Sequence, residues 1–452
     1  MNSLGPRLVI AGTHSGVGKT TIATGLMAAF TQAGWATASA KVGPDFIDPG
    51  FHSIATGRPP RNLDPWICGP DAIAPLAARA GAGRELLIVE GVMGLFDGAV
   101  DGTPSSTADV AELLDAPVVL VVDGSAMSAS VAALVRGYRD HRPSLRFAGV
   151  ILNRVGGAHH RELLSEALDT IDVPVLGSLG RDDTFAWRDR HLGLVPVEER
   201  PDEVSVSITQ LGRAVSEGCD LDALAAIARS APALATESLP VAERVGSVRI
   251  AVAGGPAFTF VYRDNVEALE AAGAELIPFD PLADEALPPD IDGLWVGGGF
   301  PEVFVGRLVD NRPLLEAVRA AVAGGLPTWA ECGGLLWLAS ALDGRPLIGA
   351  VAATGSMTDR LTLGYRTAEV RHANPLAPEG AVLRGHEFHY STLEPGGDAL
   401  ELRSRFGTRT EGFATPTLLA TYLHQHLGAD PAPAQRFVRT CLEARPGSKD
   451  SF

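Results

Sequence analysis

Short apolar runs alternate with amphipathic stretches along the first half of the chain. Each run ends at Gly, Asp or Asn, which is typical of strands buried on both faces of a sheet. The segments 20–34 and 130–141 between them have helical periodicity. This alternation predicts a parallel sheet covered by helices on both faces. The expected strands are 7–12, 36–43, 85–91, 116–123, 147–155 and 173–179.

The alternation weakens around 180–245 and then restarts, which predicts a second α/β domain. The Ala/Pro-rich stretch 230–247 is typical of a linker and shows no period-2 pattern. We therefore expect an α/β protein with two domains, 1–235 and 247–452, joined by a linker at 236–246. The later segment 380–394 is richer in strand-forming residues. The strands expected in the second domain are 247–255, 274–280, 293–299 and 326–334.

Composition and charge narrow the classes of function. The chain has 452 residues, 46% of them hydrophobic and 20% charged, which favours a folded globular protein over a disordered one. The formal net charge is −17, and no cluster of Lys and Arg stands out, which argues against nucleic acid or an anionic membrane as a partner. The four cysteines are far apart, and no leader pattern or membrane-length apolar run is present. We expect a cytoplasmic protein.

The stretch "AGTHSGVGKTTIATGL" at 11–26 follows the first expected strand and opens the first expected helix. Glycines allow a close approach of backbone N–H groups to phosphate, Lys19 can neutralise β/γ oxygens and the Thr20 hydroxyl can bind Mg²⁺. The spacing departs from the usual pattern because position 13 is Thr. A glycine-rich turn with an incidental lysine is the alternative. The expected ATP-binding residues here are Thr13, Gly16, Gly18, Lys19, Thr20 and Thr21.

Charged residues follow two further strands and indicate a magnesium site. "KVGPDFIDPG" (41–50) carries Lys41, Asp45 and Asp48, and "IVEGVMGLFDG" (88–98) carries Glu90 and Asp97. The carboxyl ends of parallel strands meet at one edge of a sheet, and Mg²⁺ favours carboxylates together with phosphate oxygens. We expect Thr20, Asp48 and Glu90 to bind the metal, Lys41 to contact phosphate, and Asp45 and Asp97 to lie near the acceptor. Asn153 either faces the adenine or forms a turn.

The second domain offers a cysteine nucleophile. "TWAECGGLLWLA" (328–339) places Cys332 at a strand end before two glycines, and "TYLHQHLG" (421–428) supplies histidine as a base. A nucleophilic cysteine needs such a base and N–H donors for an oxyanion. The glycine loop 297–299, through Gly298 and Gly299, and the Gly333 amide are the expected donors. Taken alone, a cysteine in an apolar context such as Cys332 is more often a buried core residue.

The C-terminal half resembles the class I glutamine amidotransferase domain that is fused in cobyrinic-acid and cobyric-acid amide synthases. The resemblance rests on the "ECGG" turn and the "YLH" strand end. It implies that Cys332 is the nucleophile and His424 its base. Many class I glutaminases carry Glu two residues after this histidine, but this chain has His426. The resemblance therefore leaves open which group orients His424.

The N-terminal half resembles dethiobiotin synthetase, whose phosphate loop has the same stretched spacing. The combination of "GTHSGVGKT", "KVGPDFIDPGFH", "LDPW", "VEGVMGLFDG" and "ECGGLLWL", together with "GYR" and "GHEFHYS", is similar to the cobyrinic or hydrogenobyrinic acid a,c-diamide synthase family over essentially the whole chain. This implies ATP, Mg²⁺, L-glutamine and a corrinoid acid as the small molecules bound, an acyl phosphate and locally released ammonia. It also implies a homodimer. Arg58, Arg61 and Arg366 are candidate contacts to the acid groups of the corrinoid, or plain surface arginines.

Three other interpretations stay open at this stage. One is the same chemistry on another tetrapyrrole, as in a nickel-sirohydrochlorin a,c-diamide synthase. A second is a P-loop regulatory ATPase with a degenerate glutaminase-like domain, which predicts a missing Cys or His. A third is a structural α/β protein with an inert cysteine. The "HEFH" segment does not predict a metal site, because His386 and His389 point to opposite faces of a strand.

Overall fold

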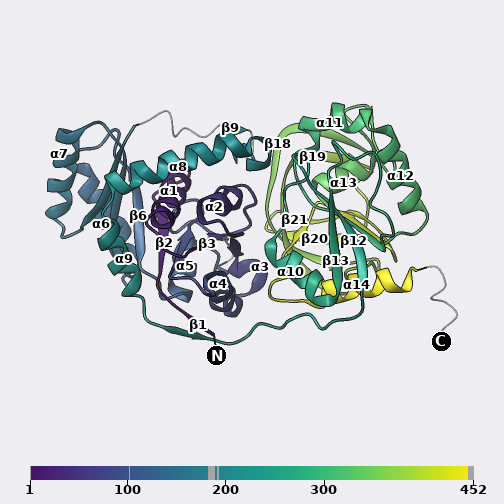
Figure 1. Ribbon diagram of the computed structural model, residues 1–452, viewed down its shortest axis with the longest axis horizontal. Helices are drawn as coiled ribbons and strands as arrows, with labels where there is room; N and C mark the ends of the chain where they lie inside the picture. Colours follow the sequence, from purple (N-terminus) through teal and green to yellow (C-terminus); the bar gives the residue numbers. More distant parts are fainter. Residues whose placement is uncertain (1, 101, 182–188, 191–192, 446–452) are drawn as a thin grey trace. The chain divides into compact units, whose positions relative to one another are not determined.

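The computed structural model describes residues 2–100, 102–181, 189–190 and 193–445, and it divides the chain into two compact units. The first unit comprises Met1–Leu239 and the second Pro240–Phe452 (Figure 1). Each unit carries its own sheet and its own core. The two-domain α/β class expected from the sequence is confirmed.

The first unit is built on a parallel sheet with the strand order β4-β3-β5-β2-β6-β7-β8. Its inner strands are buried along their length because both faces are covered, which explains their unbroken apolar runs. Strand β2 lies in the interior of the sheet, so the loop that follows it opens at an edge shared with the ends of β3 and β5. The strands are β2 (Arg7–Gly12), β3 (Thr37–Val42), β4 (Arg61–Leu63), β5 (Leu86–Glu90), β6 (Val118–Asp123), β7 (Phe147–Val155) and β8 (Val175–Gly180).

Helices α1 to α7 of this unit lie between strands of the sheet along the chain, and α8 and α9 follow its last strand, β8. Helices α1, α2 and α8 pack together, as do α6 and α7 (Figure 1). The helices are α1 (Lys19–Gln32), α2 (Asp48–Thr56), α3 (Pro65–Cys68), α4 (Ile73–Gly81), α5 (Thr107–Leu113), α6 (Ser130–His141), α7 (Ala158–Asp169), α8 (Pro201–Gly218) and α9 (Leu221–Arg229), with 3₁₀ turns at Pro70–Ala72 and Val197–Glu199.

A short antiparallel pair lies outside the main sheet. Strand β1 (Asn2–Leu4) pairs with β11 (Leu234–Thr236), so that Asn2 lies opposite Thr236. The stretch 230–247, which the sequence indicated as a linker, therefore begins inside the first unit. A second small pair joins β9 (Asp189–Arg190) and β10 (Gly193–Leu194).

The second unit contains a mostly parallel sheet with the order β13-β12-β14-β15-β23-β22. All neighbours are parallel except β22, which pairs antiparallel with β23 at the edge. Strands β14 and β15 are fully buried, and their carboxyl ends lead into the glycine loop 297–299 and the cysteine turn. The strands are β12 (Val248–Ala253), β13 (Ala274–Phe279), β14 (Gly293–Val296), β15 (Thr328–Glu331), β22 (Phe413–Thr415) and β23 (Leu418–Thr421).

The second unit also contains a largely antiparallel sheet. Of this sheet, the sequence analysis predicted strand only for the segment 380–394. Its longest ladder joins β18 to β19 and is interrupted by a bulge between Met357 and Thr362. The path β17-β16-β18-β19-β24 is extended by β20 and β21. The strands are β16 (Ala339–Leu342), β17 (Arg345–Pro346), β18 (Val351–Val370), β19 (Val382–Glu394), β20 (Leu400–Ser404), β21 (Gly407–Glu411) and β24 (His424–Gln425).

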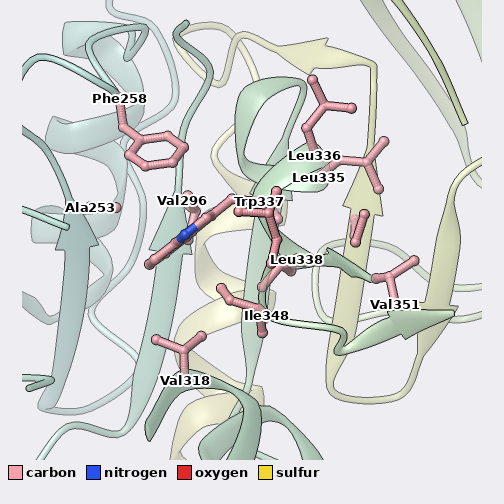
Figure 2. Close-up of a cluster of buried hydrophobic side chains, with 14 of the residues drawn as sticks. Ala253, Phe258, Val296, Val318, Leu335, Leu336, Trp337, Leu338, Ile348 and Val351 are labelled. Carbon is pink, nitrogen blue, oxygen red and sulfur yellow. The ribbon is translucent and has the colours of Figure 1, made fainter. Parts of the chain in front are cut away.

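The core of the second unit lies directly beneath the cysteine turn. Helix α13 (Gly333–Leu338) is buried throughout, and Trp337 packs against Phe258 with ring centroids 5.2 Å apart (Figure 2). Burying each leucine of this helix contributes roughly 1.5–3 kcal/mol, which anchors the turn before it. The remaining helices are α10 (Arg263–Ala272), α11 (Pro301–Asp310), α12 (Arg312–Ala323) and α14 (Ala432–Glu443).

Two general observations complete the fold. Among the described helices, none combines the length and hydropathy required to cross a bilayer. None of the cysteines Cys68, Cys219, Cys332 and Cys441, all within the described ranges, forms a disulfide.

Candidate functional site

The loop 13–18 in the first unit connects β2 to α1 and is shaped for close backbone approach. Gly18 has φ +94°, a left-handed conformation that favours glycine, and a Cβ there would lie 2.2 Å from Nδ2 of Asn153. The Asn153 amide donates to the Val17 carbonyl at 2.9 Å. Asn153 therefore supports the backbone of this loop.

Lys19 begins helix α1 and is buried beside the loop. Its Nζ donates to the His14 carbonyl at 3.3 Å. Burial and the nearby Lys41 lower the pKa of Lys19 to about 8, while Glu90, Asp48 and Asp97 act in the opposite direction. A bound anion would favour the charged form and restore a higher pKa. Thr13 lies in the loop, where its carbonyl accepts from Tyr138, and Thr21 lies in α1.

Thr20, Lys41, Asp48 and Glu90 converge next to the loop. The Thr20 hydroxyl donates to Glu90 Oε1 at 2.7 Å and to Asp48 Oδ2 at 3.2 Å. Lys41 Nζ lies 2.6 Å from Asp48 Oδ2 and 2.9 Å from Glu90 Oε1, and it donates to the Gly91 carbonyl at 3.0 Å. The four side chains come from α1, β3, α2 and β5. The structure thus brings together all three residues expected to bind metal.

The buried ionisable side chains of this cluster shift one another's pKa values. Burial opposes charge on Glu90, but Lys41 and the hydrogen bond with His52 outweigh it and lower the Glu90 pKa. Asp48 and Glu90 likewise overcome the effect of burial and raise the Lys41 pKa. Burial and Asp45 raise the pKa of Asp48. Two ionised carboxylates would exceed the single ammonium of Lys41, which is why Asp48 favours its neutral form, and a bound divalent cation would favour its ionised form.

His52 belongs to this cluster and was not among the predicted residues. Its Nε2 lies 2.6 Å from Glu90 Oε2, and both side chains are fully buried. Asp48 and His52 lie one turn apart on α2, so they share a face of the helix. That i, i+4 spacing in "DPGFH" was the available signal.

Asp45 and Asp97 hold backbone in the loops around the cluster. Asp45 Oδ1 accepts from the amides of Ile47 at 2.9 Å and Asp48 at 3.1 Å. Asp97 Oδ2 accepts from the Gly94 amide at 2.8 Å. Both carboxylates therefore support segments that border the loop 13–18, called the anion loop below, and the carboxylate cluster of Asp48 and Glu90.

In the second unit, Cys332 lies on a strained turn between β15 and α13. It has φ +48° and ψ −99°, a conformation that costs energy for a residue with a side chain. A strand–turn–helix of this kind projects a nucleophile from a sheet end. Its amide donates to the Thr421 carbonyl at 2.8 Å, and Sγ lies 4.0 Å from the Phe388 carbonyl. Burial and Glu302 raise the pKa of the Cys332 thiol, so it needs a base.

The expected oxyanion donors are corrected in one respect. The Gly298 amide donates to the Phe260 carbonyl at 3.3 Å and is thereby engaged. Gly299 and Gly333 face each other, since a Cβ on Gly333 would lie 2.9 Å from the Gly299 nitrogen. Amides from these two positions remain the candidates for stabilising an oxyanion.

His424 follows β23, the strand that neighbours the cysteine strand β15, and is 1% exposed. Burial and the nearby His389 lower its pKa to about 3, so the imidazole is neutral and able to accept a proton at physiological pH. Gly298 lies against it, because a Cβ there would be 2.5 Å from His424 Cε1. The expected nucleophile and the expected base thus come from neighbouring strand ends.

We expect Gly298→Ala to reduce glutamine hydrolysis by about 100-fold, because the added methyl group displaces the His424 ring. Steady-state ammonia release from glutamine measures this. Gly306→Ala is the matched control, since a Cβ there meets only the end of the Arg345 side chain at 3.4 Å. Equal activity of the two variants would show that the approach of Gly298 to His424 does not matter.

Glu331, next to the cysteine, is a buried acid that the sequence did not single out. Burial raises its pKa to about 8, and its Oε1 accepts from the Gln425 amide at 2.9 Å. A raised folded-state pKa means that the native protein holds this proton more tightly than the unfolded chain. The contribution to stability is therefore present at acid pH and is lost as pH rises from the ordinary glutamate value toward 8.

Replacing Glu331 by Gln removes this titration. The melting temperature of Glu331→Gln relative to wild type is expected to rise as pH increases from about 4.5 to about 8. Thermal unfolding over a pH series checks this. A difference that stays constant across the series would contradict a buried, proton-binding Glu331.

The three arginines that were predicted to contact the acid groups of the corrinoid are divided between the two units. Arg58 in the first unit donates to the Ala82 carbonyl at 2.9 Å, and Arg61 lies buried on β4. Arg366 belongs to the second unit, where its Nε pairs with Glu387 Oε2 at 2.5 Å. Arg366 is therefore part of a buried ion pair and not an exposed basic group.

Two family models match the chain, one in each unit. Residues 8–194 match the CobQ/CobB/MinD/ParA nucleotide binding domain, and residues 249–432 match the CobB/CobQ-like glutamine amidotransferase domain. The two matches cover the anion loop with its carboxylate cluster and the Cys332–His424 site, respectively.

Curated relatives match along nearly the whole chain. The hydrogenobyrinate a,c-diamide synthase of Streptomyces coelicolor is 46% identical and covers 96% of this chain and 97% of the relative. That of Thermobifida fusca is 45% identical, covering 98% of each. The cobyrinate a,c-diamide synthase of a Synechococcus strain is 42% identical, covering 97% of this chain and 98% of the relative.

Proposed function

Because the chain belongs to the family of cobyrinate and hydrogenobyrinate a,c-diamide synthases, we propose that it amidates the a and c acetate side chains of cobyrinic or hydrogenobyrinic acid in cobalamin biosynthesis, using ATP and L-glutamine. One observation carries the proposal. A single chain holds both an anion loop with a carboxylate cluster and a strained cysteine with a neutral buried histidine. The first suits activation of a carboxylate, and the second suits release of nitrogen.

Activation is needed because hydroxide is a poor leaving group. Transfer of the γ-phosphoryl group of ATP to a side-chain carboxylate gives an acyl phosphate and ADP. Lys19 and the amides of the loop 13–18 would stabilise the charge on the phosphoryl oxygens. Lys41 is held by Asp48 and Glu90, which fixes its ammonium group at the edge of the same site.

The cluster also fits Mg²⁺. Thr20, Asp48 and Glu90 provide hydroxyl and carboxylate oxygens, the ligands that this hard cation favours, and a bound divalent ion would favour the ionised form of Asp48. When bound there, Mg²⁺ supplies neutralisation of phosphate oxygens. The His52 ring contacts Oε2 of Glu90 and so holds the carboxylate with its other oxygen, Oε1, facing Thr20.

Nitrogen is released at Cys332. His424 takes the thiol proton as sulfur attacks the side-chain amide carbon of glutamine, and the oxyanion is stabilised by the Gly299 and Gly333 amides. The protonated imidazole returns its proton to the leaving ammonia, and a thioester remains. Water then attacks the thioester with the help of His424 and yields glutamate.

Coupling the two sites solves a problem of protonation. Free ammonia at neutral pH is mostly ammonium, which is not a nucleophile. Ammonia that is released locally can attack the acyl phosphate before it is protonated, giving the amide and phosphate. A homodimer, implied by the family resemblance, and a cytoplasmic location, expected from the sequence, stay predictions.

The direct test incubates the purified protein with ATP, Mg²⁺ and glutamine in three parallel reactions. Their acceptors are hydrogenobyrinic acid, cobyrinic acid and nickel-sirohydrochlorin, and mass spectrometry counts the amides formed. We expect a diamide with at least one of the two corrin acids. Turnover of the nickel compound alone would move the assignment to that acceptor, and turnover of none would overturn the proposal.

A further inference from the structure

The backbone that carries His424 is held by side chains from two other elements. Glu331 of β15 accepts from the Gln425 amide at 2.9 Å, and both residues are buried. Asn265 of α10 donates to the Gln425 carbonyl at 2.8 Å and accepts from the Leu427 amide at 2.7 Å. The segment after the base is therefore fixed by polar contacts at the amide and the carbonyl of Gln425 and at the amide of Leu427.

The ring of His424 is held by a different contact. Strand β24 pairs with β19 so that His424 lies directly opposite His386. The two imidazoles stack, with centroids 4.9 Å apart and planes within 17° of each other. His386 is 1% exposed, and its Nδ1 lies 3.4 Å from the Tyr262 hydroxyl. Cross-strand stacking of flat rings restricts rotation of both.

His426 stands where many class I glutaminases carry a carboxylate, and its side chain makes other contacts. His426 Nδ1 accepts from the Gly428 amide at 3.2 Å, and its Nε2 lies 3.6 Å from Asp264 Oδ2. Its ring packs against Tyr262 with centroids 4.6 Å apart. His426 therefore stabilises the turn after the base, and another group has to orient the His424 imidazole.

We propose that Glu331 and His386 together position His424 against Cys332, in the place of a triad carboxylate. Glu331 is the residue before the nucleophile, so its bond to Gln425 ties the strand ends of Cys332 and His424 to each other. His386 sets the plane of the imidazole. Both are positioning residues and neither contacts the reacting atoms. This inference rests on the glutaminase step of the proposed function.

The expected size of the effect follows from the sensitivity of proton transfer to geometry. A displacement of the base by about 1 Å can cost about 100-fold in rate. Such a loss falls on kcat and on kcat/KM equally, because glutamine binding is unchanged while the transition state is less stabilised. A merely structural lesion lowers the amount of folded protein and leaves the kcat of the folded fraction intact.

The experiment compares matched pairs at both residues by glutamine hydrolysis. Glu331→Gln keeps a carbonyl acceptor for the Gln425 amide, whereas Glu331→Ala removes it. His386→Phe keeps a flat ring, whereas His386→Leu has similar bulk without one. We expect Glu331→Ala and His386→Leu to lose about 100-fold in kcat with KM within about threefold of wild type, and Glu331→Gln and His386→Phe to keep kcat within about fivefold.

Two controls separate positioning from folding. Val318→Ala makes a cavity in the core of the second unit, where Val318 is fully buried (Figure 2), and should lower the melting temperature while leaving kcat unchanged. Amidation driven by high ammonium at alkaline pH bypasses the glutaminase and should be equal in all five variants and wild type. Should Glu331→Ala not fold, Glu331→Asp, one methylene shorter, replaces it with the same expected loss of kcat.

The outcomes distinguish this inference from the function on which it rests. Full kcat in Glu331→Ala and His386→Leu, with an active wild type, overturns the positioning role alone. Equal losses within each pair also overturn it, because the acceptor and the flat ring would then not be what matters. A wild-type protein that does not hydrolyse glutamine overturns the proposed function and this inference with it.

Discussion

Replacing Cys332 by Ala is expected to abolish glutamine-dependent amidation, with a loss of at least about 1,000-fold. Amidation from high ammonium at alkaline pH should persist at the wild-type rate. The reason is that Cys332 only supplies nitrogen, while the acceptor carboxylate is activated in the other unit. Mass spectrometry of the corrin product, with each nitrogen source in turn, measures both rates.

Cys441→Ala is the matched control for this experiment. Cys441 is fully buried in the same unit on α14, so its replacement removes the same atoms from a core position. We expect full activity with both nitrogen sources. Should Cys332→Ala work equally well with glutamine, Cys332 would be a core cysteine and the glutaminase assignment would be wrong.

Replacing Lys19 by Met is expected to impair activation of the carboxylate and to spare the glutaminase. Amidation should fall by at least about 100-fold with glutamine and with ammonium alike, because a charge that stabilises the phosphoryl group is lost in both cases. Hydrolysis of glutamine at Cys332 should stay measurable. Assays of ADP, amide and ammonia in the same reaction mixtures separate the two activities.

The control for Lys19→Met is Arg84→Met, which removes an exposed positive charge in the same unit. Arg84 lies before β5, at the amino ends of the parallel strands, whereas the loop 13–18 follows the carboxyl end of β2. This variant should behave as wild type. Loss of amidation with glutamine but not with ammonium in Lys19→Met would contradict the assignment of the anion loop to carboxylate activation.

The strands of the parallel sheets could be predicted because their signal is local. Strands β2 and β7 begin and end at the predicted residues, since apolar runs bounded by turn residues define buried parallel strands. The pairing of β1 with β11 was not predictable in this way, because it joins segments more than two hundred residues apart. The alternating ladder of β18 and β19 has polar positions throughout, so its pattern is weak.

Whether a site residue could be predicted likewise depends on whether its signal is local in the sequence. Thr20, Asp48 and Glu90 could be grouped from the sequence because each lies at the start of a helix or at the end of a strand at the carboxyl edge of one sheet. Glu331, His386 and Asn265 could not, because their importance arises from contacts to the backbone or ring at 424–427. Gly298 was wrongly expected to donate to an oxyanion, because its amide pairs with Phe260.

The central claim is that one chain activates a corrin carboxylate with ATP and amidates it with nitrogen from glutamine. The most direct measurement uses glutamine labelled with ¹⁵N in the side-chain amide and a corrin acid labelled with ¹⁸O in its carboxylates. We predict a diamide that carries ¹⁵N in both new amides, and one ¹⁸O in each phosphate released, as an acyl phosphate requires. Unlabelled phosphate, or amides without ¹⁵N, would contradict the account.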